Sequence, residues 1–324
     1  MAVYTEVSDG ELERFVAGYG LGQLMSCKGI AEGVENTNYL ITTSSGPFIL
    51  TLYERRVARE DLPFFLGLKQ HLHGRGVPCP LPVTALDGRT LLELSGRAAA
   101  LITFLDGVSV RRPDVWHCRA VGEALARMHL AADGFKQFRR NALGLDGWRP
   151  LFAKFQSAAD SITPGLNALI SGELQHLEST WPSDLPQGII HADLFPDNVF
   201  FLSDKLSGLI DFYFACNDAL AYDLAVCLNA WCFDPNHAFN INKGRVLLAG
   251  YNSVRALTSH EREALPLLAR GASIRFLLTR SFDWINTPKD ALVRPHDPLD
   301  YIARLRFHQR VDDAAAYGLD RSPL

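Results

Sequence analysis

The 324-residue sequence lacks most features that mark membrane, secreted and nucleic-acid-binding proteins. Its formal net charge of −4 at pH 7 offers no broad basic surface to nucleic acid or anionic lipid. The longest apolar run, near residues 98–105, is far too short to cross a bilayer. The first residues show no basic stretch followed by an apolar one, so we expect no secretory signal. We therefore expect a protein that binds neither membranes nor nucleic acid.

Cysteine is present but scattered, and no two cysteines have the CxxC spacing of metal sites or redox pairs. The six are Cys27, Cys79, Cys118, Cys216, Cys227 and Cys232. In a chain of this length without an expected secretory signal, reduced and mostly buried thiols are the simplest interpretation. We therefore expect a cytoplasmic protein, and no pattern in the sequence indicates its oligomeric state.

The sequence changes character near residue 107, which predicts two lobes. Strand-like segments precede this point, after an N-terminal helix capped by Ser8 and Glu11, and helical segments follow it. The expected strands are 38–42, 47–53, 89–94 and 98–104, with a helix over 62–73. The expected later helices are 116–129, 221–231, 244–258, 260–279 and 299–315. This predicts an α+β fold with a small β-rich N-lobe (1–103), a larger, mostly helical C-lobe (104–324) and a hinge at about 103–107.

Residues 189–212, IIHADLFPDNVFFLSDKLSGLIDF, place polar side chains between apolar runs that look like buried strands. Charge is expensive there, so these groups either satisfy one another or hold a charged ligand. Asp193 falls on a loop, where a hydroxyl group could lose its proton. Asn198 and Asp211 offer a neutral and a charged oxygen, which suit a magnesium ion shared with phosphate oxygens. One base with two such ligands is the arrangement that phosphoryl transfer needs.

The pattern HxDxxxxN with a following Asp resembles the catalytic loop and metal-binding Asp of protein kinases. The residues of the loop, HADLFPDN at 191–198, are more similar to those of the aminoglycoside phosphotransferase and choline kinase group, in which the loop commonly reads HGDLHPGN. AYDLA at 221–225 and LARMH at 125–129 match two further signatures of that group. Within the group, GVENTNYLITTSSGPFILTLYE at 33–54 and NALGLDGW at 141–148 resemble the kinase-fold homoserine kinases. The resemblance covers essentially the whole chain.

The resemblance implies a bilobal protein-kinase-like fold that transfers the γ-phosphoryl group of ATP to the hydroxyl of L-homoserine, with magnesium, in threonine biosynthesis. Asp193 would deprotonate or orient the hydroxyl. Asn198 and Asp211 would hold the metal. His191 would brace the loop by hydrogen bonding, and Asp223 would accept hydrogen bonds from the backbone of the loop.

The resemblance also implies a nucleotide site in the N-lobe, with the loop 33–38 over the phosphates and the hinge backbone against adenine. This loop has one glycine, so an Asn-rich entry into a hairpin is an alternative interpretation of it. The implied residues are Gly33, Asn36, Thr37, Asn38, Thr51, Thr103, Phe104 and Leu105.

Thr51 is the largest departure from the wider pattern, because kinases of this fold normally carry a phosphate-binding Lys at that position. The homoserine kinase subfamily shares the departure. Arg55 or Lys28 could replace the missing charge, and the sequence does not decide between them.

The acceptor pocket is the least determined part of the site. Trp231 follows Asp223 at helical spacing, in a region that lines the acceptor site of similar proteins, but it could equally be core. Arg275 and Arg280 lie on an otherwise apolar helix and suit a carboxylate, although a solvated Arg is the alternative.

Three other functions stay open at this point. The first is a kinase of the same fold for choline, an aminoglycoside or another small hydroxylated amine. The second is a nucleotide-binding pseudokinase, which the change at Thr51 motivates, although Asp193, Asn198 and Asp211 are all intact. The third is a protein kinase, for which the stretch from Asp211 to Asp223 is too short to form a regulated activation segment.

Overall fold

A computed structural model describes residues 5–30, 36–54, 58–288 and 294–319. The chain divides into two compact units, of which the first contains residues 1–107, 135–137 and 207–213. The second contains residues 108–134, 138–206 and 214–324. The first division lies next to the hinge expected at 103–107. No pattern in the sequence indicated that residues 135–137 and 207–213 return to the first unit.

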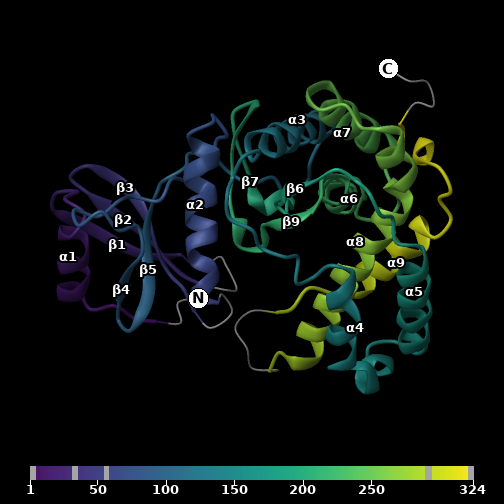
Figure 1. The fold of residues 1–324 in the computed structure, drawn as a ribbon. Helices are drawn as coiled ribbons and strands as arrows, with labels where there is room; N and C mark the ends of the chain where they lie inside the picture. The colour runs from purple at the N-terminus through teal and green to yellow at the C-terminus, as the bar shows by residue number, and fades with distance from the viewer. Residues whose placement is uncertain (1–4, 31–35, 55–57, 289–293, 320–324) are drawn as a thin grey trace. The chain divides into compact units, whose positions relative to one another are not determined.

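The first unit is built on a five-stranded antiparallel sheet in the order β1-β2-β3-β5-β4 (Figure 1). Its strands are β1 (Leu24–Ile30), β2 (Thr37–Thr43), β3 (Gly46–Leu52), β4 (Leu92–Leu94) and β5 (Arg97–Thr103). Its helices are α1 (Asp9–Ala17) and α2 (Leu62–His73), with a short 3₁₀ turn, η1 (Arg59–Asp61), before α2.

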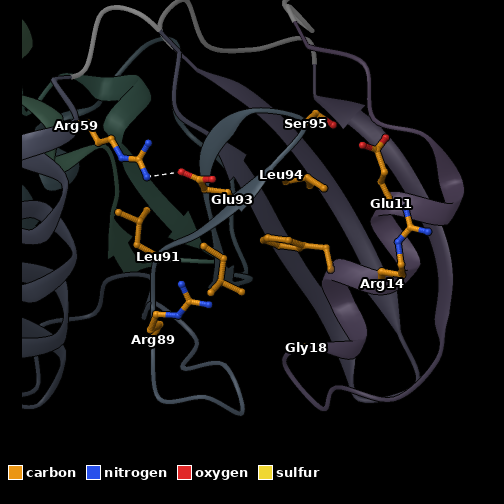
Figure 2. Close-up of a pocket in the computed structure, with 11 residues that line it drawn as sticks. Glu11, Arg14, Gly18, Arg59, Arg89, Leu91, Glu93, Leu94 and Ser95 are labelled. Carbon is orange, nitrogen blue, oxygen red and sulfur yellow. Dashed lines mark hydrogen bonds and ion pairs between the residues drawn. The ribbon is translucent and has the colours of Figure 1, made fainter.

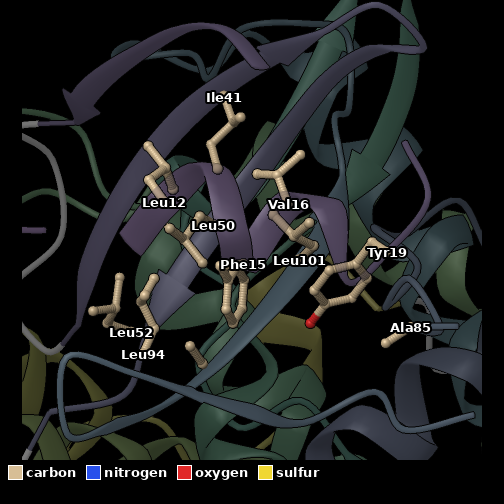
Figure 3. Close-up of a cluster of buried hydrophobic side chains, with 11 residues drawn as sticks. Leu12, Phe15, Val16, Tyr19, Ile41, Leu50, Leu52, Ala85, Leu94 and Leu101 are labelled. Carbon is tan, nitrogen blue, oxygen red and sulfur yellow. The ribbon is translucent and has the colours of Figure 1, made fainter. Parts of the chain in front are cut away.

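Helix α1 begins with the expected capping box. The side chain of Ser8 pairs with the backbone of Glu11, and the side chain of Glu11 pairs with the backbone of Ser8. Leu12, Phe15 and Val16 then form one apolar face and are buried. Figure 3 shows this face among side chains from the sheet, including Leu50. Burying a large apolar side chain of this kind contributes roughly 1.5–3 kcal/mol, so this contact fixes the helix on the sheet.

The hairpin β2–β3 and the helix α2 confirm the segments predicted at 38–53 and 62–73. Strand β1 was not predicted, because most of its residues are exposed and it shows no alternation of apolar and polar residues. It is held instead by its pairing with β2, for example Lys28 opposite Leu40.

The second unit is mainly helical (Figure 1). Its helices are α3 (Val115–Ala131), α4 (Leu145–Ala153), α5 (Leu166–Thr180), α6 (Leu220–Trp231), α7 (Ile241–Val254), α8 (Ser259–Asn286) and α9 (Leu299–His308). Two small sheets pair β6 (Gln187–Ile190) with β9 (Cys216–Ala219), and β7 (Val199–Leu202) with β8 (Lys205–Leu209). Residues 207–209 of β8 are counted with the first unit. The short 3₁₀ turns are η2 (Gln156–Ser161), η3 (Pro196–Asn198), η4 (Phe212–Phe214) and η5 (Ala314–Tyr317).

The helix predicted over 299–315 is too long. Helix α9 ends at His308, and Asp313 starts the separate turn η5 by accepting a hydrogen bond from the backbone of Ala315. Aspartate favours such capping over the interior of a helix, which explains the break. In the part of the chain that the structure describes, no helix has the length and apolar character needed to cross a membrane.

Candidate active site

The loop from His191 to Asn198 connects β6 to the turn η3 and strand β7. Ala192 has φ of 63°, in the left-handed region that costs a residue with a side chain about 1–2 kcal/mol. The phosphotransferase group commonly has glycine at this position. The strained conformation of Ala192 therefore has to be stabilised by its surroundings.

Asp223, on α6, provides this stabilisation from a fully buried position. Its carboxylate accepts the backbone N–H of His191 at 2.6 Å and that of Ala192 at 2.9 Å. These are the contacts expected if Asp223 accepts hydrogen bonds from the backbone of the loop. The contact ties the backbone of the loop to α6.

A second partner of Asp223 is His129, at the end of the LARMH motif on α3, whose Nε2 lies 3.0 Å from the carboxylate. The other ring nitrogen, Nδ1, lies 2.8 Å from the hydroxyl of Tyr251. Burial by itself raises the pKa of Asp223, but the bond and charge of His129, together with His191, outweigh it and lower the pKa. The sequence had marked this motif only as a family signature.

Asp193 sits where the loop turns, and Asn198 holds it. The amide nitrogen of Asn198 donates to the Asp193 carbonyl at 2.8 Å and lies 3.3 Å from its carboxylate Oδ2. The backbone N–H of Asp193 donates to Nδ1 of His191 at 3.3 Å, and the His191 side chain is fully buried. These contacts agree with a bracing position for His191.

The side-chain oxygen of Asn198 accepts no hydrogen bond from the described residues. The nitrogen faces Asp193, so the oxygen is not engaged in these contacts, and oxygen is the donor atom that magnesium prefers. The described residues contain no cluster of three His, Cys, Asp or Glu side chains that could hold a metal.

Arg275, on α8, also contacts the loop 191–198. Its guanidinium donates to the carbonyl of Ala192 and lies 3.7 Å from the carboxylate of Asp193. It also lies over the rings of Phe276 and Phe214, at 4.2 and 5.3 Å from their centroids. The residue is 2% exposed, so the solvated alternative for Arg275 is wrong.

Trp231 lies beneath the loop and is fully buried, and its indole N–H donates to the carbonyl of Leu194 at 2.7 Å. The thiol of Cys227 approaches the same carbonyl at 3.8 Å. Its only polar atom, the indole nitrogen, is already paired within the protein. The structure therefore favours the core alternative for Trp231.

Arg280 lies further along α8 and is partly buried. Its Nη1 donates to the carbonyl of Asp297 at 3.3 Å and lies 3.4 Å from the carboxylate of Asp300. Its guanidinium is 4.6 Å from the ring centre of Tyr301. Tyr301 and its neighbour Arg304 on α9 were not singled out from the sequence, because an Arg and a Tyr on an amphipathic helix give no distinctive signal.

Asp211 belongs to the first unit and follows β8. It is exposed and has φ of 61°, another left-handed residue with a side chain. Lys69, on α2 of the same unit, is 4% exposed, and burial lowers its pKa to about 8, against the opposing charges of Cys79 and Asp211. Lys69 is thus a buried cation whose charge acts on Asp211, and the sequence did not point to it.

Thr51 is buried in β3, and its hydroxyl donates to the side-chain oxygen of Asn38 at 2.8 Å. This polar pair occupies the position where the wider group has lysine. Of the two suggested replacements, Lys28 is exposed on β1, and Arg55 lies outside the described residues.

The side chains of Asn36 and Thr37 are buried and serve the first unit itself. Asn36 accepts the backbone N–H of Glu54 at 3.3 Å, and the hydroxyl of Thr37 donates to the Glu54 carboxylate at 2.9 Å. These bonds close the β2–β3 hairpin, so the alternative of an Asn-rich hairpin entry accounts for these side chains. Gly33 lies outside the described residues.

Thr103 ends β5, and its backbone and hydroxyl both bond to Leu81. Phe104 is 41% exposed. Leu105 packs so closely on Gly208 that a Cβ there would lie 2.3 Å from a methyl group of the leucine. A side chain at this point of β8 would force the side chain of Leu105 to move.

A separate pocket of about 770 Å³ opens in the first unit, between α1 and the β4 region (Figure 2). It is lined by Arg14, Arg59, Arg89 and apolar residues such as Phe15 and Leu92. None of the residues expected at the nucleotide or acceptor site lines it.

Comparison with known proteins gives the geometry a context. Residues 26–257 match the model of a family described as "Phosphotransferase enzyme family". Homoserine kinase of Rhodospirillum rubrum is 60% identical over 321 residues, covering 99% of this chain and all of that protein. Homoserine kinase of Bradyrhizobium diazoefficiens is 61% identical over 325 residues, covering 100% of this chain and 99% of that protein.

Solved structures share the fold at low identity. Spectinomycin phosphotransferase, crystallised with ADP and spectinomycin, has a TM-score of 0.69 at 13% identity, with 97% of this chain and 98% of that chain covered. A microcompartment-associated aminopropanol kinase has a TM-score of 0.64 at 17% identity, with 97% and 99% covered. Both are kinase-like phosphotransferases, which confirms the expected fold class.

Proposed function

The chain belongs to the phosphotransferase enzyme family, and we propose that it is an ATP-dependent kinase that converts L-homoserine to O-phospho-L-homoserine. The observation that carries this proposal is the identity of about 60%, over essentially full length, with proteins named homoserine kinase. Identity at this level over the full length supports the same acceptor as well as the same reaction. The step belongs to threonine biosynthesis.

In the proposed reaction the hydroxyl oxygen of homoserine attacks the γ-phosphorus of ATP. The bond between that phosphorus and the β–γ bridging oxygen breaks, and ADP leaves. The hydroxyl proton passes to the carboxylate of Asp193. Asn198 and Arg275, which contact Asp193, keep that carboxylate in place.

We further propose that Asn198 and Asp211 hold magnesium, which would neutralise charge on the phosphate groups. The free side-chain oxygen of Asn198 supports its part of this proposal. For the nucleotide, we propose backbone contacts from residues 36–38 to the phosphates and from residues 103–105 to adenine. Asp223 and His191 would act through the loop they support.

For the acceptor, we propose that Arg280 faces the carboxylate of homoserine. Arg275 is already engaged by Ala192 and Asp193, so we assign it to positioning the base. The six free cysteines support a reducing compartment, and we propose a cytoplasmic location.

A coupled assay of ADP release tests the proposal with homoserine, choline, serine, kanamycin and 3-amino-1-propanol as acceptors. We expect kcat/KM to be highest for homoserine. Activity confined to acceptors that are not amino acids would reject the assignment. An ATP-dependent thermal shift without ADP release for any acceptor would instead support the pseudokinase alternative.

A further inference from the structure

Two buried donors on α9 have no hydrogen-bond partner among the described residues: the hydroxyl of Tyr301 and Nε of Arg304. Tyr301 is fully buried. Nearly all buried polar groups in proteins are hydrogen-bonded, and leaving one unpaired is costly, so such a pair requires an explanation. The Nε of arginine can only donate, so the partner missing at this point is an acceptor.

The same place gathers positive charge. The guanidinium groups of Arg280 and Arg304 lie 4.6 and 4.5 Å from the ring centre of Tyr301. Arg280 faces the carboxylate of Asp300 at 3.4 Å. Arg304 has no carboxylate partner within the described ranges, and its Nη1 donates to the carbonyl of Asn229 at 2.6 Å. A partly buried cation without a counter-ion is unfavourable, and an anion would relieve it.

The cluster adjoins the catalytic loop. Phe276 joins the two, because its ring lies 5.3 Å from that of Tyr301 and 4.2 Å from the guanidinium of Arg275. Burial raises the pKa of Tyr301, and the charges of Arg304, Arg280, Asp193 and Arg275 all act on it. The unpaired phenol therefore lies within electrostatic reach of both the arginines and the base.

We infer that Tyr301 and Arg304, together with Arg280, form the subsite for the α-carboxylate of the acceptor. The inference rests on the proposed function and adds Tyr301 and Arg304, which had no proposed role, to Arg280. A carboxylate offers acceptors to both unpaired donors and compensates the charge of Arg304. In homoserine, three carbon atoms separate this carboxylate from the reacting hydroxyl, which would then face Asp193.

The test compares L-homoserine with 3-amino-1-propanol, which has the hydroxyl and amine but no carboxylate. Arg304→Met should raise the KM for homoserine about 30- to 100-fold, the value of a lost charge-assisted bond, and barely change kcat/KM for aminopropanol. Tyr301→Phe keeps the ring and should raise the KM for homoserine about 3- to 10-fold. Arg306→Met, at an exposed position on the same helix, should change neither value.

Equal losses on both acceptors would show that Arg304 only supports the structure and would overturn the subsite. An unchanged homoserine KM in both Arg304→Met and Tyr301→Phe would also overturn it. Tyr301→Phe retains all packing, so it decides the matter even if Arg304→Met does not fold. A wild-type enzyme that uses aminopropanol and not homoserine would overturn the proposed function as well, which is a separate outcome because it appears without any substitution.

Discussion

The guanidinium of Arg275 lies 3.7 Å from the carboxylate of Asp193 while it also bonds to the carbonyl of Ala192. One side chain thus holds the expected base and the strained residue before it. Because Arg275 is 2% exposed and stacked on Phe276, it is fixed itself. The position of the base is therefore determined by α8 as well as by the loop.

Replacing Arg275 should reduce turnover more than substrate binding. We expect Arg275→Gln to lower kcat about 10- to 100-fold, because Asp193 loses a charged partner and its alignment. The KM for ATP should change less than about threefold by the same reasoning. Steady-state kinetics at saturating homoserine measure both values. Arg275→Lys keeps the charge and should recover part of kcat, whereas equal rates in both variants and wild type would contradict the positioning role.

Replacing Asp223 should destabilise the protein as well as inactivate it. Asp223→Ala leaves the backbone N–H groups of His191 and Ala192 without their acceptor, and removes the partner of His129. Breaking a buried charged contact of this kind costs roughly 3–5 kcal/mol. Urea unfolding measures the loss, and Asp223→Asn should lose less because it keeps one oxygen. A loss below about 1 kcal/mol in Asp223→Ala, the size of one ordinary hydrogen bond, would contradict this account.

Replacing Asp211 should leave folding intact and remove catalysis. The residue is exposed, so Asp211→Ala should unfold at nearly the wild-type temperature. We expect kcat to fall at least about a thousandfold, because positioning and charge neutralisation dominate phosphoryl transfer. Asp211→Asn should need more magnesium for half-maximal rate, which a magnesium titration measures. A folded Asp211→Ala enzyme with a near-normal rate would refute the metal assignment.

His308 should make the protein less stable in acid. Burial, with the charges of Arg304 and Arg270, lowers its pKa to about 3, below the usual value of about 6.5 in an unfolded chain. As the pH falls from about 6.5 towards 3, the unfolded chain takes up a proton that the folded protein does not. The free energy of unfolding should therefore fall by about 1.4 kcal/mol per pH unit in this range and be fully retained above it.

Urea unfolding between pH 7.5 and pH 5 measures this slope, with His308→Gln as the matched variant. The variant loses the contact of His308 with the hydroxyl of Tyr317 at 2.7 Å, so it should be less stable at pH 7.5. Its dependence on pH should be flatter by about one proton. Parallel curves for the two proteins would contradict the buried neutral state of His308.

Local patterns were sufficient to predict those elements that local residues determine. The capping box at Ser8 and the apolar spacing after it predict α1, and the strand-like segments 38–42 and 47–53 predict the β2–β3 hairpin. Strand β1 could not be predicted, since its exposed residues depend on a partner strand for their structure. The end of α9 at His308 depends on the cap at Asp313, which periodicity alone does not reveal.

In the candidate site too, local motifs predicted some residues, whereas others are defined only by contacts in the folded protein. Motif spacing indicated Asp193 and Asn198, because the catalytic loop is short and its residues are close in sequence. The contact between Arg275 and Asp193 joins residues far apart in the chain, so no local pattern could distinguish it from a solvated arginine. Tyr301 and Arg304 are likewise defined only by what surrounds them in the fold.

The most direct test of the central claim is to identify the product. Purified protein is incubated with ATP, magnesium and L-homoserine, and the products are analysed by ³¹P NMR and mass spectrometry. We predict O-phospho-L-homoserine in a one-to-one ratio with ADP, and a rate at least about a thousandfold lower for Asp193→Ala. ADP formation without phosphohomoserine, or an Asp193→Ala enzyme as fast as the wild type, would contradict the account.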